Sequence, residues 1–470
     1  MTWLCLSISL LTIATPAKDA WAGSPDFLWA RQGGGGGEDV GASVAVDSVG
    51  NSFVVGWFNG NAGFGDRTLI GRGSDDAFLA AYSSGGSLLW IQQAGGAATD
   101  RAIGLALDGD GNCYVTGFFQ GQADFGSITL TSQGAEDVFL AKYDPQGEVL
   151  WVQHAGGGPR AYGCSAAVDQ AGCCYVGGYF GGSATFGDTT FTSQGNIDVF
   201  VAKYDPAGHL LWVRQGPAAG SEGNMCGIAL DAAGNSYITG WFSGTVSFGE
   251  TSLTSLRSDG IFLAKYDAAG NLLRAQQVGT GDHAHAIAVA ADPAGNCWLT
   301  GGFWGTAVFG PTTLAGWGTY DVFVAKYDSS GDLLWVSQAG SDYSDSGCGI
   351  AVDGAGNSYI AGAFWSNARF GDTTLATRGG SDAFLAAYDF AGHLRWVRQA
   401  GGGSGDQANS VAVDASGNCY VAGLFSSTAG FGNVSLNSQG GYDMFVTKLG
   451  GPPVGPTISN VRVSEPPAMA

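Results

Sequence analysis

The chain has 470 residues, of which 81 are glycine, 45% are hydrophobic and 12% are aromatic, and its formal net charge is −21. The apolar and aromatic content excludes a disordered chain, and the presence of only 13 prolines excludes collagen. A chain this acidic lacks the cationic surface that non-specific binding to nucleic acid or anionic lipid requires, so we expect neither as a partner.

Residues 1–22 are predicted to be a signal peptide. An apolar run at residues 3–14 is shorter than the roughly 20 residues that span a bilayer, and Ala20-Trp21-Ala22 fits a cleavage site after Ala22. No Lys or Arg precedes the run, which leaves open an upstream start, an atypical signal or a short apolar strand. No later run is long enough to span a membrane. We therefore expect a secreted or extracellular protein, with the periplasm and the cell surface as alternatives.

Residues 23–450 contain a repeat of about 61 residues. A Phe-Gly pair recurs at spacings of 61 or 62 residues, and another Phe follows each of these glycines by thirteen positions. A turn of the form D-x-x-G-N occurs once in each copy, with Cys173 in place of Asn in the third. The first residues of the Phe-Gly pairs are Phe64, Phe125, Phe186, Phe248, Phe309, Phe370 and Phe431. Such regularity predicts one structural unit per copy.

Each copy predicts four strands, which we call a, b, c and d. In the fourth copy these are residues 226–231, 236–242, 261–267 and 272–277. Alternating large and small residues and a high content of β-branched and aromatic residues favour strands over helices. Tight turns join a to b and c to d, whereas about eighteen residues separate b from c. We expect this longer link, which holds the Phe-Gly pair, to form a small extra hairpin.

The two ends of the repeat region favour a propeller over an open solenoid. The last copy ends at strand c (444–449), whereas residues 27–32 form a strand d that no copy precedes. Trp29 stands at the position that Trp occupies in most copies, with Arg274 as the exception. The sequence therefore predicts an all-β fold: a seven-bladed β-propeller of four-stranded antiparallel blades, closed by the N-terminal strand completing the last blade.

Two segments resemble a known repeat family. The sequences DVFVAKYDPAGHLLW (198–212) and GIALDAAGNSYITG (227–240) resemble the SBBP-type bacterial β-propeller repeat. The a–b turn is also similar to that of the NHL repeat, which lacks the long b–c link. The resemblance covers about residues 26–449 and implies a propeller fold and an exported protein. It implies no common reaction and no catalytic motif.

The eight cysteines outside the signal peptide are expected to be free thiols that fill the core. Four of them share a position at the start of strand b and three share a position in strand a, and the two positions are too far apart for disulfides. The recurring lysines of strand c are expected to be structural, with their charged ends near solvent or a turn Asp. The first group is Cys113, Cys174, Cys297 and Cys419, and the second is Cys164, Cys226 and Cys348.

Four aspartates lie eight residues before the a–b turn Asp and are candidate ligands for a hard cation. In a propeller this position precedes the innermost strand, so the carboxylates would face the channel mouth and could bind Ca²⁺. The alternative, which we favour, is that each carboxylate caps the backbone of its own loop. These residues are Asp39, Asp100, Asp345 and Asp406.

A second candidate site lies in the d–a link of the fourth copy. Asp282, His283 and His285 occur together there, and histidine and carboxylate side chains supply general acids, bases and metal ligands. With Asp342, Tyr343 and Asp345 of the next copy, they are the best candidates for a catalytic site at the channel mouth. The alternative is a chance grouping in a loop, because no catalytic motif occurs.

The function expected from the sequence is that of a secreted, non-enzymatic scaffold or binding module. It would present its loop face to a glycan or a protein, and no cofactor is expected except for Ca²⁺. The alternative is a carbohydrate-active hydrolase or lyase with its site at the channel mouth. Residues 451–470 are predicted to be a Pro-rich linker whose end either packs on the propeller or starts a further β-domain.

Overall fold

The computed structural model describes residues 24–218, 223–255 and 257–450. These residues form strands and turns, with no helix among them, and the strands pair antiparallel. Accordingly, no helix in these ranges could serve as a membrane span. The predicted signal peptide at 1–22 and the segment 451–470 lie outside the described residues.

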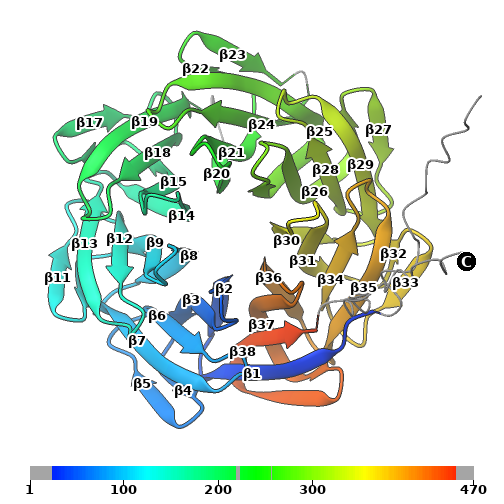
Figure 1. Cartoon of the computed structure of the whole chain (residues 1–470), viewed down its shortest axis with the longest axis horizontal. Coiled ribbons are helices and arrows are strands. Elements are labelled where there is room, and N and C mark those ends of the chain that lie inside the picture. The colour runs from blue at the N-terminus through cyan, green and yellow to red at the C-terminus, as the bar shows by residue number, and fades with distance from the viewer. Residues whose placement is uncertain (1–23, 219–222, 256, 451–470) are drawn as a thin grey trace, which may run out of the picture.

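The strands form four-stranded units arranged around a central opening (Figure 1). Within a unit the order is a-b-c-d, as in β8–β9–β12–β13, and strand a is the innermost. We number the units in chain order from the one that contains β2. The unit formed by β36, β37, β38 and β1 brings together the two ends of the described chain.

Strands a and b form the inner half of each unit. Strand a is formed by β2 (Val40–Val46), β8 (Arg101–Leu107), β14 (Arg160–Val168), β20 (Gly223–Leu230), the second part of β25 (Leu272–Ala291), β30 (Ser346–Val352) and β36 (Asp406–Val413). Strand b is formed by β3 (Ser52–Phe58), β9 (Cys113–Phe119), β15 (Cys174–Gly181), β21 (Ser236–Phe242), the first part of β26 (Cys297–Phe309), β31 (Ser358–Phe364) and the first part of β37 (Cys419–Phe431).

Strands c and d form the outer half. Strand c is formed by β6 (Asp76–Tyr82), β12 (Asp137–Tyr143), β18 (Asp198–Tyr204), β24 (Asp259–Tyr266), β28 (Asp321–Tyr327), β34 (Asp382–Tyr388) and the end of β38 (Val434–Leu449). Strand d is formed by β7 (Leu88–Gly96), β13 (Val149–Ala155), β19 (Leu210–Ala218), the first part of β25, β29 (Leu333–Gly340), β35 (Leu394–Gly402) and β1 (Phe27–Gly35).

The b–c link forms the extra hairpin that the sequence predicts, and this hairpin reaches the neighbouring unit. Its first strand pairs with strand d of the preceding unit, as in β7–β10 and β1–β4. Separate hairpin strands are β4 (Asn61–Phe64), β5 (Arg67–Ile70), β10 (Gln122–Phe125), β11 (Ile128–Thr131), β16 (Ser183–Phe186), β17 (Thr189–Thr192), β22 (Thr245–Phe248), β23 (Thr251–Thr254), β27 (Thr312–Ala315), β32 (Asn367–Phe370) and β33 (Thr373–Ala376). In two units the hairpin continues β26 and β37.

The spacing of the repeated phenylalanines follows from core packing. The Phe of each Phe-Gly pair packs against the Phe of strand c, with ring centroids 5.0 Å apart for Phe64 and Phe78 and 4.9 Å apart for Phe125 and Phe139. Both rings of each of these pairs are buried. A glycine of strand b lies beneath the strand c ring: at Gly423 a Cβ would lie 2.8 Å from the Phe445 ring. The constant spacing between the two phenylalanines is therefore explained by one packed aromatic pair in each unit.

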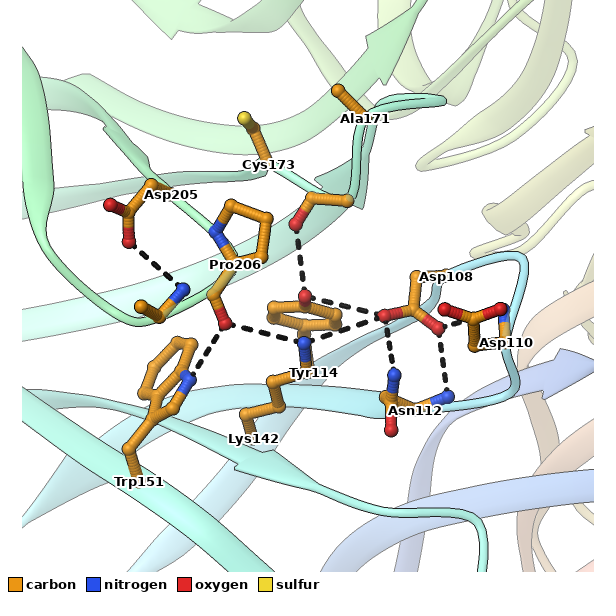
Figure 2. Close-up of polar contacts among 12 residues, drawn as sticks. Asp108, Asp110, Asn112, Tyr114, Lys142, Trp151, Ala171, Cys173, Asp205 and Pro206 are labelled. Carbon is orange, nitrogen blue, oxygen red and sulfur yellow. Dashed lines mark hydrogen bonds and ion pairs between the residues drawn. The ribbon is translucent and has the colours of Figure 1, made fainter.

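In several units a buried polar cluster joins the unit to the next at the face that carries the a–b and c–d turns, and Figure 2 shows the cluster of unit 2. In unit 2, the Lys142 ammonium lies 3.5 Å from the Asp108 carboxylate and 4.8 Å from the centroid of the Tyr114 ring. The Tyr114 hydroxyl donates to the Gly172 carbonyl of unit 3, and the Trp151 indole N–H donates to the Pro206 carbonyl. The prediction that the strand c lysines reach solvent or a turn Asp is confirmed for Lys142, Lys203 and Lys265, each of which forms an ion pair with the a–b turn Asp of its own unit.

The ends of the described chain meet in the same way. Strand β1 pairs with β38 from Phe27↔Leu449 to Gly33↔Met444, as predicted for the segment around Trp29. The Thr447 hydroxyl donates to the Trp29 carbonyl, and the Tyr420 hydroxyl donates to the Gly50 carbonyl of unit 1. In Figure 1, β1 lies beside β38.

The cysteines whose side chains the structure describes are free thiols, as predicted. Those at the start of strand b are buried. The expected burial of the strand a cysteines is wrong for Cys164 and Cys348, which are only partly buried. These two residues lie on the wall of the central channel, where strand a bulges.

We expect Trp29→Ala to destabilise the fold, because the Trp29 side chain is buried and donates to the Ser84 carbonyl of unit 1. Truncating a buried Trp costs about 3–5 kcal/mol. The matched control is Leu28→Ala, because Leu28 is the adjacent residue of β1 and is exposed. Urea denaturation followed by tryptophan fluorescence and circular dichroism measures both. Equal effects of the two substitutions would contradict this packing of β1.

Candidate functional site

The strands a surround a central channel with a volume of about 390 Å³. Each strand a carries a β-bulge at one position, and six of the bulged residues line the channel. Bulged residues that line the channel are Ala42, Ile103, Cys164, Ile287, Cys348 and Asn409. The described residues that line this wall include no acidic or basic side chain.

The d–a links and the starts of the b–c hairpins share one face, whose inner edge is a rim of the channel, as expected from the strand order; the hairpins themselves extend outward beyond strand d (Figure 1). At three unit boundaries, one side chain near the start of strand a contacts both a carboxylate and an aromatic ring of the preceding unit. Arg101 forms an ion pair with Asp75 and lies 4.7 Å from the centroid of the Trp57 ring. The Tyr162 hydroxyl donates to Glu136, and its ring lies 4.4 Å from that of Phe118.

The third such boundary, between units 4 and 5, contains two histidines. His285 Nε2 lies 3.1 Å from Asp259 Oδ2, and the imidazole stacks on Trp241 at 4.4 Å. His283 Nδ1 lies 2.8 Å from the same oxygen, Asp259 Oδ2, and its ring stacks on Trp304 at 5.3 Å. One atom from each of these three side chains lies within 4.8 Å of the others. It is the one group in the described ranges that brings together three His, Cys, Asp or Glu side chains at metal-binding distance.

The sequence predicted two of these three residues. His283 and His285 come together, but Asp282 points away from them: it forms an ion pair with Arg257 at 3.1 Å and accepts from the Thr306 amide. Asp259 was missed, because it belongs to strand c of the preceding unit. A signal was present in the sequence, since 26 residues separate Asp259 from His285 and also separate Asp75 from Arg101.

The four predicted cation ligands lie in separate d–a links. Each is almost fully buried and accepts hydrogen bonds from its own link and from the end of strand b. Asp39, for example, accepts from the amides of Gly35 (2.7 Å) and Asn59 (3.1 Å), and Asp345 accepts from the amide of Trp365 (2.8 Å). Asp100 and Asp406 make the equivalent contacts.

Each of these four aspartates faces a second buried carboxyl group at the start of strand c of the preceding unit. The two carboxyl groups of each pair lie on either side of a glycine. A side chain at Gly34 would collide with both groups, because its Cβ would lie 2.8 Å from Asp39 Oδ2 and 2.5 Å from the Asp443 carboxyl carbon. Burial raises the pKa of Asp39 to about 6 and that of Asp443 to about 7, and the Asp39 carboxylate adds to the upward shift of the Asp443 pKa. The other pairs are Asp76 with Asp100, Asp321 with Asp345, and Asp382 with Asp406.

Exposed aromatic side chains gather on the rim of units 5 and 6. Trp304, Trp317, Tyr343 and Trp365 are each between 42% and 57% exposed. The Gly316 amide donates to the Gly305 carbonyl and so brings Trp304 and Trp317 to the base of the same hairpin. Phe390, the other exposed aromatic residue among the described ones, lies in a c–d turn on the opposite face.

Comparison with known families identifies the repeat. The family model SBBP, described as a beta-propeller repeat, matches residues 28–63, 334–367 and 395–424. The all-β, antiparallel architecture agrees with this match. The chain therefore carries SBBP beta-propeller repeats in these three segments.

Two curated proteins show partial similarity. An uncharacterized WD repeat-containing protein of Acanthamoeba polyphaga mimivirus is 24% identical over 502 aligned positions, which cover 85% of this chain and 36% of the relative. The regulatory protein FlaEY of Caulobacter vibrioides is 31% identical over 149 positions, which cover 30% of this chain and 16% of the relative. The chain thus spans well under half the length of either relative.

Solved structures resemble the fold at low identity. The quinohemoprotein alcohol dehydrogenase of Comamonas testosteroni has a TM-score of 0.42 at 10% identity and is matched over 90% of this chain and 76% of its own. Sqt1 of Chaetomium thermophilum has a TM-score of 0.41 at 12% identity, over 89% and 85% of the two chains. At these values the likeness carries no conclusion about activity.

The paired carboxyl groups generate a pH-dependent prediction. Unfolded aspartates titrate near pH 3.9, whereas Asp443 and Asp39 titrate near 7 and 6 in the folded state. Between these values the folded protein holds more protons than the unfolded chain, so these groups make the folded state less stable as the pH rises from about 4 to 7. Asp443→Asn removes one of the two charges and is expected to raise the thermal midpoint above that of the wild type at pH 7.5 but not at pH 4.

The control for this experiment is Asp66→Asn, because the Asp66 side chain is 92% exposed. Thermal unfolding followed by circular dichroism at several pH values between 4 and 8 measures all three proteins. A difference between Asp443→Asn and the wild type that does not grow with pH would show that the carboxyl pair carries no such repulsion.

Proposed function

We propose that this protein is an exported binding module built as a closed, seven-bladed β-propeller, whose rim at units 5 and 6 binds a glycan. Two contacts support the closed arrangement: β1 pairs with β38, and the Tyr420 hydroxyl bonds to the first a–b turn. The predicted signal peptide supports export. The single observation that carries the binding role is the gathering of Trp304, Trp317, Tyr343 and Trp365 on one rim.

Exposed aromatic rings are costly to leave in water and mark binding surfaces. The apolar C–H faces of pyranose rings stack on such rings, while their hydroxyl groups bond to nearby carboxylates. Asp282, whose side chain is 51% exposed, supplies an acceptor beside this rim. The net charge of −21 favours a neutral glycan over an acidic one.

The distribution of aliphatic side chains favours a glycan over a protein ligand. Protein–protein interfaces bury an apolar centre, and exposed leucines are residues that could form such a centre. These leucines, however, lie along the strands d at the outer edge, away from the aromatic rim. They are Leu28, Leu89, Leu150, Leu211, Leu273 and Leu334.

Screening against an array of neutral glycans, followed by calorimetry on the best ligand, tests this function. Trp304→Ala and Trp365→Ala are each expected to weaken binding roughly five- to tenfold, since one aromatic contact is worth about 1–1.5 kcal/mol. Phe390→Ala, on the opposite face, is the control and should leave affinity unchanged. Binding that survives both tryptophan substitutions, or no binding to any glycan, would contradict the proposal.

A second candidate function is a carbohydrate-active hydrolase or lyase with its site at the channel mouth. The observation that favours it is the convergence of Asp259, His283 and His285 beside Trp304. Incubation with a panel of polysaccharides, followed by detection of reducing ends and unsaturated products, distinguishes the two functions. Turnover that is lost in His283→Ala would establish the enzyme.

A further inference from the structure

We propose that Asp259, His283 and His285 bind a divalent transition metal, zinc above all, with a coordination position left open toward solvent. The proposal is independent of glycan binding. It rests on the geometry of these three side chains and on the way in which this unit boundary differs from the others.

Two of the three ligand separations are close to the value that zinc requires, and all three lie within 4.8 Å. Tetrahedral zinc, with bonds of about 2.0–2.1 Å to nitrogen and oxygen, holds its ligand atoms roughly 3.3 Å apart. Asp259 Oδ2 lies 2.8 Å from His283 Nδ1 and 3.1 Å from His285 Nε2. Rotation of the two imidazoles that brings all three atoms to this separation would replace these hydrogen bonds by bonds to one ion.

The ligand set selects among metals. Two imidazole nitrogens and one carboxylate oxygen suit zinc and its neighbours in the first transition row, whereas Ca²⁺ and Mg²⁺ prefer oxygen ligands alone. Three protein ligands leave at least one position for water. The His283 and His285 side chains are 40% and 28% exposed, so that position opens to the rim.

The boundary between units 1 and 2 contains a structural counterpart of the Asp259–His285 contact. At the first boundary the Arg101–Asp75 ion pair makes the same bridge, 26 residues apart, and the residue that corresponds to His283 is Thr99. His285 alone would therefore be a structural bridge. His283 adds the third ligand atom, and it does so only at this boundary.

Zinc binding to the full chain, measured by isothermal titration calorimetry after treatment with EDTA, tests the inference. We expect one equivalent of Zn²⁺ to bind, and Co²⁺ to give the visible absorption of a four- or five-coordinate ion. His283→Ala and Asp259→Asn should each weaken zinc binding at least tenfold. His209→Ala is the matched control, because His209 faces Asp205 at 2.9 Å in an exposed turn with no third ligand, and it should leave zinc affinity unchanged.

A further variant, His285→Arg, separates metal binding from structure. It reproduces the Arg101–Asp75 bridge, so the protein should keep its thermal midpoint but lose zinc binding and the cobalt spectrum. Zinc that binds equally well to His283→Ala, or to His285→Arg, would overturn the proposal, as would the absence of any zinc binding by the wild-type chain.

Discussion

A tyrosine hydroxyl of strand b donates a hydrogen bond to a carbonyl in the a–b turn of the next unit. This contact fixes the relative position of the two units, and the shape of the rim depends on that position. The distance from this hydroxyl to the glycine carbonyl is 2.9 Å for Tyr114 and 3.0 Å for Tyr175 and Tyr237. It is also 3.0 Å for Tyr420, where the last unit meets the first. Because a buried hydroxyl without a partner costs about 1–3 kcal/mol, each contact specifies one relative position of neighbouring units. The boundary that joins the two ends of the described chain is therefore built like the others.

The face of the a–b and c–d turns is more uniform than the opposite face. The same Asp, Lys and Tyr recur there in several units, as at Asp108, Lys142 and Tyr114 and at Asp169, Lys203 and Tyr175. The opposite rim is less uniform: four boundaries carry a buried carboxyl pair, whereas the boundary between units 4 and 5 carries two histidines. Binding residues commonly lie on variable loops held by a rigid scaffold. The constancy of the turn face leaves the rim free to vary without loss of the fold.

Local patterns in the sequence were sufficient to predict the strands, the turns and the N-terminal strand of the last unit, because each depends on spacing within a copy. Contacts between copies were harder to predict. The pairing of each hairpin with the preceding strand d and the bulge in strand a left no mark in composition. Asp259 was overlooked because Gly260 occupies the position of the recurrent strand c aspartate, and Asp259 stands one place before it, at the position of Asp75 in unit 1.

The same boundary explains why two histidines can meet there. At four other boundaries, as at Asp443 and Asp39, a buried carboxyl pair flanks a glycine with positive φ (158° at Gly34). Between units 4 and 5 both carboxylates are missing, since Gly260 and Ala284 replace them, and the link runs on as one strand, β25 (Leu272–Ala291). Alternate residues of a strand share a face, so His283 and His285 both point toward Asp259. Loss of the buried acid pair thus creates the exposed group of possible metal ligands.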